Sequence, residues 1–110
     1  MIGGYIPGSR GIGELLIGEY QGEKLIFLKR LIAGLTPHLR AEIYEAIKGL
    51  RTPKCPFANL PETKRSKYAV TAEVMRECGW VKPERQCEVE FIERTKGGSL
   101  RHAEFRRLVG

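Results

Sequence analysis

One amphipathic helix, set between two groups of strand-like segments, constrains the fold of this chain more than any other feature. The Thr36 hydroxyl is a capping group and Pro37 suits the first helical position, so the helix is predicted to begin there. Gly49 marks its end after about three turns. Apolar residues recur at helical spacing at Leu39, Ile43, Ala46, Ile47 and Leu50. This stripe predicts a helix face packed on the core.

Strand-like segments flank the helix on both sides. Before it lie a short strand at 1–5, a loop at 7–13, and a hairpin of 14–20 and 24–32. After it, 51–61 is expected to be a loop, 71–78 a short helix capped by Thr71, 79–83 and 86–95 further strands, and 99–108 a strand or short coil. This order predicts a mainly β fold: a five-stranded OB-fold Greek-key barrel with one main α-helix between strands 3 and 4. The length of 110 residues suits a single domain over 1–110.

The residue types argue against several classes of site. All 13 acidic residues are glutamate, and a magnesium or calcium site usually recruits aspartate. The cysteines Cys55, Cys78 and Cys87 form no C-x-x-C pair, and their spacing from His38 and His102 matches no metal pattern. For His102 a hydrogen-bonded structural role is expected in preference to that of a general base, and no Ser-His-acid or Cys-His arrangement is visible. No catalytic residue and no metal ligand are therefore predicted.

The cellular setting follows from two further features. The chain has no apolar run of about 18 residues, so no membrane span is expected. Unpaired cysteines suit a reducing compartment, which predicts a cytoplasmic protein.

Positive charge predicts a polyanionic partner. Lys and Arg number 19 against 13 acids, for a net charge of +6, and cations that neutralise phosphates release counterions. The same charge could serve solubility alone. Contacts to about six phosphates would give a log–log salt slope of roughly −5 without reading sequence. The candidate DNA-binding residues are Arg10, Lys24, Lys29, Arg30, Lys64, Arg65, Lys67, Lys82, Arg101, Arg106 and Arg107.

Aromatic stacking on nucleic-acid bases is a weaker prediction. The aromatic residues are few, and most stand at core-facing positions of the expected strands. Trp80, two residues before Lys82, is the best candidate for a stacking surface, although a packed tryptophan is the favoured interpretation. This weakens the hypothesis of a single-strand binder.

Five sequence blocks stand in a familiar order along nearly the whole chain. They are 2–5 with 8–13 and 15–18, then 71–78, then Trp80-Val81-Lys82-Pro83, then Glu88-Val89-Glu90-Phe91, and finally Ser99-Leu100-Arg101-His102 with Phe105 and Leu108. Together they resemble the C-terminal OB-fold domain of ATP-dependent DNA ligases, of the bacterial and archaeal non-homologous end-joining type.

The resemblance implies a function shared between two domains. In such ligases a nucleotidyltransferase domain adenylates its own lysine, passes AMP to a 5′-phosphate and seals the nick. The OB domain alternates between the ATP tail and the minor groove opposite the nick. The implied partners are nicked double-stranded DNA and the nucleotidyltransferase domain, with this chain a monomer. ATP and Mg²⁺ are implied for the complete ligase, and no cofactor for this chain.

Departures from the family pattern bear on activity. The adenylation motif Lys-x-Asp-Gly needs an aspartate, which this chain lacks, so the chain alone is expected to be inactive. Val109 stands where the final ligase motif has an arginine, and Arg94 where a tryptophan is common. Whether Arg106 and Arg107 compensate stays open. Two alternative functions also stay open: a stand-alone nucleic-acid-binding OB module or adaptor, and a domain that binds an acidic protein.

Overall fold

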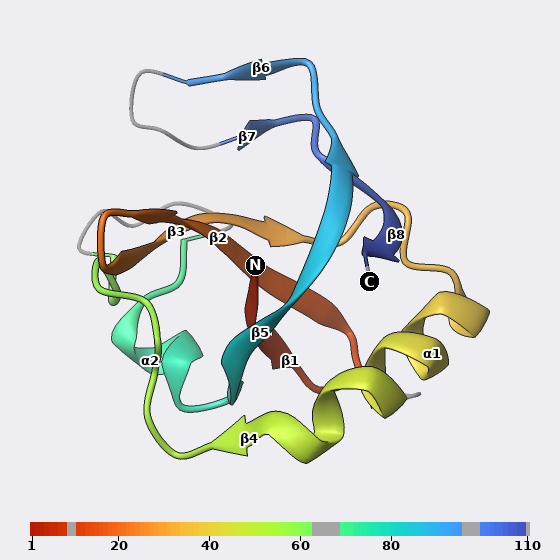
Figure 1. Ribbon diagram of the computed structural model, residues 1–110, viewed down its shortest axis with the longest axis horizontal. Helices are drawn as coiled ribbons and strands as arrows, with labels where there is room; N and C mark the ends of the chain where they lie inside the picture. Colours follow the sequence, from red (N-terminus) through yellow and green to blue (C-terminus); the bar gives the residue numbers. More distant parts are fainter. Residues whose placement is uncertain (9–10, 63–68, 96–99, 110) are drawn as a thin grey trace.

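A strongly curled antiparallel sheet forms most of the molecule (Figure 1). The computed structural model describes residues 1–8, 11–62, 69–95 and 100–109. The sheet has six strands in the order β3-β2-β1-β5-β4, and β8 also pairs with β5. Their bounds are β1 Ile2–Ile6, β2 Glu14–Gln21, β3 Lys24–Leu31, β4 Arg51–Thr52, β5 Gly79–Glu90 and β8 Glu104–Val109. A separate two-stranded ribbon is formed by β6 Glu93–Arg94 and β7 Leu100–Arg101.

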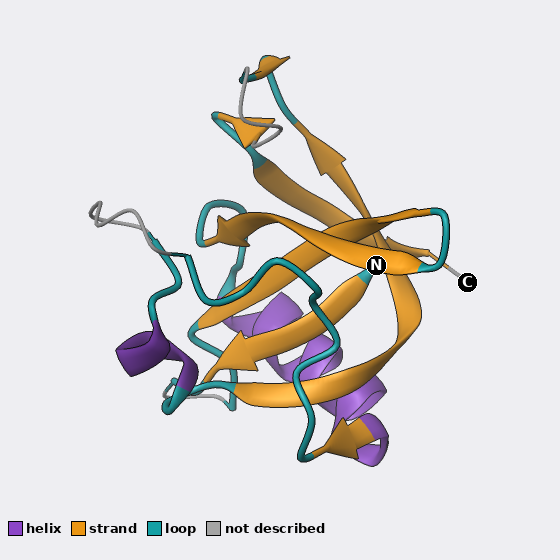
Figure 2. Ribbon diagram, turned by 90° about the vertical axis from the view of Figure 1, so that its left-hand side faces the viewer, coloured by secondary structure: helices purple, strands orange, loops and turns teal. Residues whose placement is uncertain are grey.

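The main helix begins and runs where its sequence signals predict. The helix α1 spans Pro37–Ile47, and the Thr36 hydroxyl accepts a hydrogen bond of 3.3 Å from the amide of Leu39. A 3₁₀ turn, η1 Lys48–Leu50, follows it directly. The side chains of Ile43 and Ile47 are fully buried, so α1 closes one end of the curled sheet (Figure 2). The mainly β OB-fold with one main helix is thus confirmed.

Two predicted segments are shorter than expected. The second helix, α2, covers only Ala72–Met75, although the Thr71 cap is present and accepts from the amide of Val74. The expected strand at 99–108 is divided into β7 and β8, because the chain turns at His102. None of the described helices is long or apolar enough to cross a membrane.

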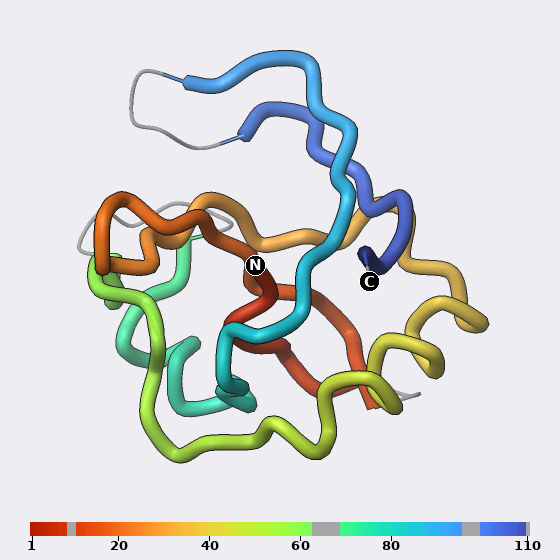
Figure 3. The backbone as a smooth tube through the Cα atoms, in the orientation of Figure 1, coloured from red at the N-terminus to blue at the C-terminus, as the bar shows by residue number. Residues whose placement is uncertain are grey.

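The strand β5 corrects the prediction of two separate strands at 79–83 and 86–95. It is one long strand whose first half pairs with β1 and β4 and whose second half pairs with β8 (Figure 3). Pro83 interrupts no regular ladder, because it lies where the β1–β5 register shifts between the pairs Gly4↔Trp80 and Ile2↔Arg85. The strand ends at Glu90, and Phe91 and Ile92 are exposed.

Two apolar clusters hold the sheet together. The larger one lies between α1 and the sheet and includes Ile2, Leu15, Val81 and Phe105. The smaller one lies on the other face of the sheet, and its centre is Phe57, in the segment expected to be a loop. Its members are Leu16, Leu25, Phe57, Val70 and Trp80.

Trp80 is packed rather than presented to solvent. Only 8% of it is exposed, and its ring meets Phe57 edge-on with centroids 6.3 Å apart. The ring of Phe57 also fills the space beside Gly3 and Gly18, where a side chain would collide with it. The favoured interpretation of Trp80 as a core residue is therefore confirmed.

The barrel has a seam between β3 and β8. The amide of Phe105 donates a 3.0 Å hydrogen bond to the carbonyl of Ala33, two residues beyond the end of β3. Gly34 follows with φ +84°, and a Cβ there would overlap the Phe105 carbonyl oxygen. Among the described residues β3 and β8 share no further backbone ladder, so this edge of β3 borders an opening.

Candidate nucleic-acid interface

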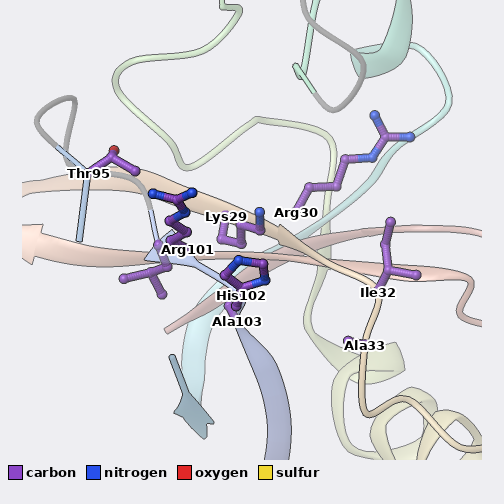
Figure 4. Close-up of a pocket in the computed structure, with 9 residues that line it drawn as sticks. Lys29, Arg30, Ile32, Ala33, Thr95, Arg101, His102 and Ala103 are labelled. Carbon is purple, nitrogen blue, oxygen red and sulfur yellow. The ribbon is translucent and has the colours of Figure 1, made fainter. Parts of the chain in front are cut away.

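A groove of about 750 Å³ opens at this seam (Figure 4). One wall is the end of β3 and the residues after it; the other is the ribbon and the turn into β8. Basic side chains from both walls face the groove, and none of the described residues lining it is acidic. The lining residues are Lys29, Arg30, Ile32, Ala33, Thr95, Leu100, Arg101, His102 and Ala103. The groove therefore offers cationic and N–H donor groups to an anion.

Arg30 is already bound by a carboxylate. Its guanidinium donates two hydrogen bonds to Glu14 on β2, of 2.6 and 3.2 Å, and both side chains are less than one-fifth exposed. The hydrogen bond to Glu14 raises the pKa of Arg30, against the opposing effect of burial. In Figure 4 the Arg30 side chain extends away from Lys29, Arg101 and His102. Arg30 borders the groove, but Glu14 neutralises its charge.

Lys29 and Arg101 both line the groove, although they come from segments distant in sequence. Lys29 makes no ion pair with another described residue. Arg101 pairs with Glu93 on the adjacent strand at 2.8 Å, and both side chains are more than half exposed. Water screens such exposed pairs, so Arg101 can exchange Glu93 for a phosphate at small cost.

His102 lines the groove, although only a structural role was predicted for it from the sequence. Its side chain is exposed, and its ring makes no hydrogen bond with another described residue. Its φ of +54° lies in the left-handed region, which histidine tolerates better than most residues. This turn between β7 and β8 aims both Arg101 and His102 at the groove (Figure 4). The sequence feature that could have indicated this role is the position of His102 directly after Arg101 in the last sequence block.

Arg106 and Arg107 lie elsewhere, on the outer face of β8. Arg106 pairs with Glu90 at 2.5 Å, and Arg107 with Glu88 at 3.0 Å. The glutamates stand at alternate, exposed positions of β5, so antiparallel pairing places them beside these arginines. What separates these two cations from Arg101 is their place, because neither lines the groove.

The remaining candidates are not gathered at the groove. Lys24 is exposed at the far end of β3, next to the turn at Gly22, and Lys82 is exposed on the first half of β5. Arg10, Lys64, Arg65 and Lys67 lie outside the described residues. Of the predicted DNA-binding residues, the structure thus brings together Lys29, Arg30 and Arg101.

The cysteines have the properties of neutral, partly buried thiols. Burial raises the pKa of Cys78 to about 11 and also raises the pKa of Cys55 and Cys87. The Cys78 thiol donates to the Val74 carbonyl at 3.3 Å. The described parts of the chain contain no group of three or more His, Cys, Asp or Glu side chains that could hold a metal ion.

Comparisons with known proteins find similarity along nearly the whole chain. A family model described as the ATP dependent DNA ligase C terminal region matches residues 8–109. The multifunctional non-homologous end joining protein LigD of Mycolicibacterium smegmatis is 35% identical over 112 residues, covering 98% of this chain and 14% of that protein. LigD of Pseudomonas aeruginosa is 29% identical over 102 residues, covering 90% of this chain and 11% of that protein.

Solved structures agree with the sequence comparisons. The crystal structure of the ligase domain from M. tuberculosis LigD matches with a TM-score of 0.81 and 32% identity, covering 98% of this chain and 33% of that chain. A mycobacterial DNA ligase D complexed with ATP and MES matches with a TM-score of 0.78 and 30% identity, covering 98% of this chain and 32% of that chain. The chain therefore spans about one-third of the solved ligase chains, and the resemblance carried by the five blocks is confirmed.

Proposed function

Because the chain belongs to the family of C-terminal regions of ATP-dependent DNA ligases, we propose that it binds nicked duplex DNA through the groove at its seam. In this proposal residues 1–110 act as one monomeric OB-fold domain beside a nucleotidyltransferase domain. That second domain supplies the adenylated lysine, and the complete ligase supplies the sites for ATP and Mg²⁺. The relatives named for non-homologous end joining suggest a role in joining broken DNA ends.

The observation that carries the proposal is the meeting of Lys29 with Arg101 and His102 in a groove whose described lining contains no acid. Cationic and N–H groups in such an arrangement bind phosphate oxygens of the DNA backbone. Backbone contacts hold a protein on a duplex without distinguishing bases. A ligase domain needs this property, because breaks occur at any sequence.

A charge-matched comparison tests the groove. The double substitution Lys29→Gln with Arg101→Gln removes two positive charges from the groove, whereas Arg106→Gln with Arg107→Gln removes two from the outer face of β8. We expect the first variant to bind a labelled nicked duplex about tenfold more weakly and the second less than twofold more weakly. Equal losses in the two variants would reject the groove as the binding site.

The dependence on a second domain has its own test. Incubated alone with labelled ATP, the chain should acquire no covalent AMP. With the separate nucleotidyltransferase domain of a LigD relative, it should increase sealing of a nicked duplex, and the groove variant should increase it less. A stable AMP adduct on this chain alone would contradict the proposed division of roles.

A further inference from the structure

We propose that the ion pair between Glu19 and Arg94 is a positioning device, which holds the β6–β7 ribbon against β2 and so sets the shape of the basic groove. The inference rests on the proposed function of the groove in DNA binding.

The pair has fork geometry. The two terminal nitrogens of Arg94 donate to the two carboxylate oxygens of Glu19, at 2.7 and 2.6 Å, across 75 residues of sequence. Two parallel hydrogen bonds fix the orientation of both groups as well as their separation. The hydrogen bond from Arg94 lowers the pKa of Glu19, so the carboxylate is charged at neutral pH.

The ribbon forms one wall of the groove. Arg94 pairs with Leu100, and Glu93 with Arg101, so the position of β6 determines where β7 presents Arg101. Thr95 and Leu100 also line the groove, together with Lys29. Figure 1 shows the ribbon extending beyond the curled sheet, above β2 and β3.

Each strand of the ribbon has its own anchor. On β7, Leu100 is only 5% exposed and belongs to the main core. On β6, the ion pair with Glu19 attaches Arg94 to β2. Ile92, the residue directly before β6, is 75% exposed and so gives this strand no apolar anchor. Because one anchor is apolar and the other is ionic, removing Glu19 should let β6 move while Leu100 keeps the ribbon attached.

Two single substitutions separate positioning from general electrostatics. Glu19→Gln and Glu93→Gln each raise the net charge by one, and each removes the partner of an arginine on the same ribbon. If charge alone matters, both should strengthen DNA binding. We expect Glu19→Gln to weaken binding to the nicked duplex about threefold, the scale set by an exposed ion pair. Glu93→Gln should leave binding unchanged or strengthen it, because it frees Arg101.

A second readout needs no DNA. In Glu19→Gln the backbone order parameters of Leu100 and Arg101, measured by NMR relaxation, should fall. In Glu93→Gln the order parameters of these two residues should fall less. Exchanging the two charges, with Glu19→Arg and Arg94→Glu together, retains the net charge and should restore both the order parameters and the affinity. Both side chains of the pair are more than one-third exposed, so these variants are expected to fold.

The outcomes distinguish this inference from the proposed function. If the groove variant loses DNA binding while Glu19→Gln leaves the ribbon ordered and the affinity unchanged, the positioning role is wrong and the groove stands. If Glu19→Gln loosens the ribbon while Lys29→Gln with Arg101→Gln binds DNA normally, the proposed DNA site is wrong, and this inference, which depends on it, falls with it. Strengthened binding by Glu19→Gln would also overturn the inference.

Discussion

The carboxylate of Glu14 accepts both hydrogen bonds of the Arg30 guanidinium, which gives Arg30 a role different from that of its neighbour Lys29. The pair joins β2 to β3 in a partly buried position, so Arg30 stabilises the sheet edge beside the groove. Lys29 makes no ion pair with a described residue and is left to meet an external anion.

This difference predicts that substitutions at these adjacent positions affect different properties, stability at Arg30 and DNA binding at Lys29. Arg30→Gln should lower the free energy of unfolding by about 1–2 kcal/mol, because Glu14 would keep a partly buried charge without its partner. Lys29→Gln should change it by less than about 0.5 kcal/mol and act on DNA binding instead. Urea unfolding of both variants checks the prediction. Equal stabilities would show that the Glu14–Arg30 pair contributes nothing to the fold.

The raised pKa of Cys78 predicts a loss of stability in alkali. Its thiol ionises near the ordinary value of 9.0 in the unfolded chain and only at about 11 in the folded chain. Between these values the unfolded state binds fewer protons, so the free energy of unfolding falls as pH rises. Cys55 and Cys87 shift in the same direction. Urea unfolding from pH 8 to 10.5 should show a shallower decline in Cys78→Ala than in the unchanged protein, and parallel curves would contradict the assignment.

Gly34 is predicted to be essential for closing the seam. Gly34→Ala combines a left-handed backbone with overlap of the new Cβ and the Phe105 carbonyl oxygen, and should cost about 3 kcal/mol. Gly22 is a matched control, because its φ is +66° and no atom lies within 4 Å of a Cβ placed there. Gly22→Ala should cost about 1 kcal/mol. Thermal unfolding measures both, and similar losses would show that the seam tolerates the added atom.

The Thr36 cap gives a local test of α1. Thr36→Ala removes the hydroxyl that accepts from the Leu39 amide and should lower the free energy of unfolding by about 1 kcal/mol. Thr36→Ser retains the hydroxyl and should cost a few tenths of that amount. If serine and alanine destabilise the protein equally, the hydrogen bond is not the source of the effect.

The sequence predicted those elements that are determined by residues close to one another along the chain. Thr36 and Pro37 set the start of α1, and the turn at Gly22 set the β2–β3 hairpin. The continuity of β5 was missed, because Pro83 is a strand breaker unless a shift in a neighbouring ladder absorbs its missing N–H. That shift depends on β1, almost eighty positions earlier in the chain.

The same distinction explains which site residues were found. Basic residue type identified Lys29 and Arg101 as candidates, but the sequence did not reveal that they share a groove. Arg106 and Arg107 were indistinguishable from these by type. Only the structure shows that they lie on β8 away from the groove, beside Glu88 and Glu90 of β5. The sequence did not reveal that His102 lies at the groove, because the turn into β8 sets the positive φ that presents it there.

The most direct test of the account is the salt dependence of binding to a nicked duplex. Plotted as log affinity against log salt concentration, the unchanged chain should give a steep negative slope. Lys29→Gln and Arg101→Gln should each reduce the steepness by about 1, while Arg106→Gln and Arg107→Gln should leave it unchanged. A flat plot for the unchanged chain, or equal slopes for all four variants, would contradict the claim that the seam groove binds the DNA backbone.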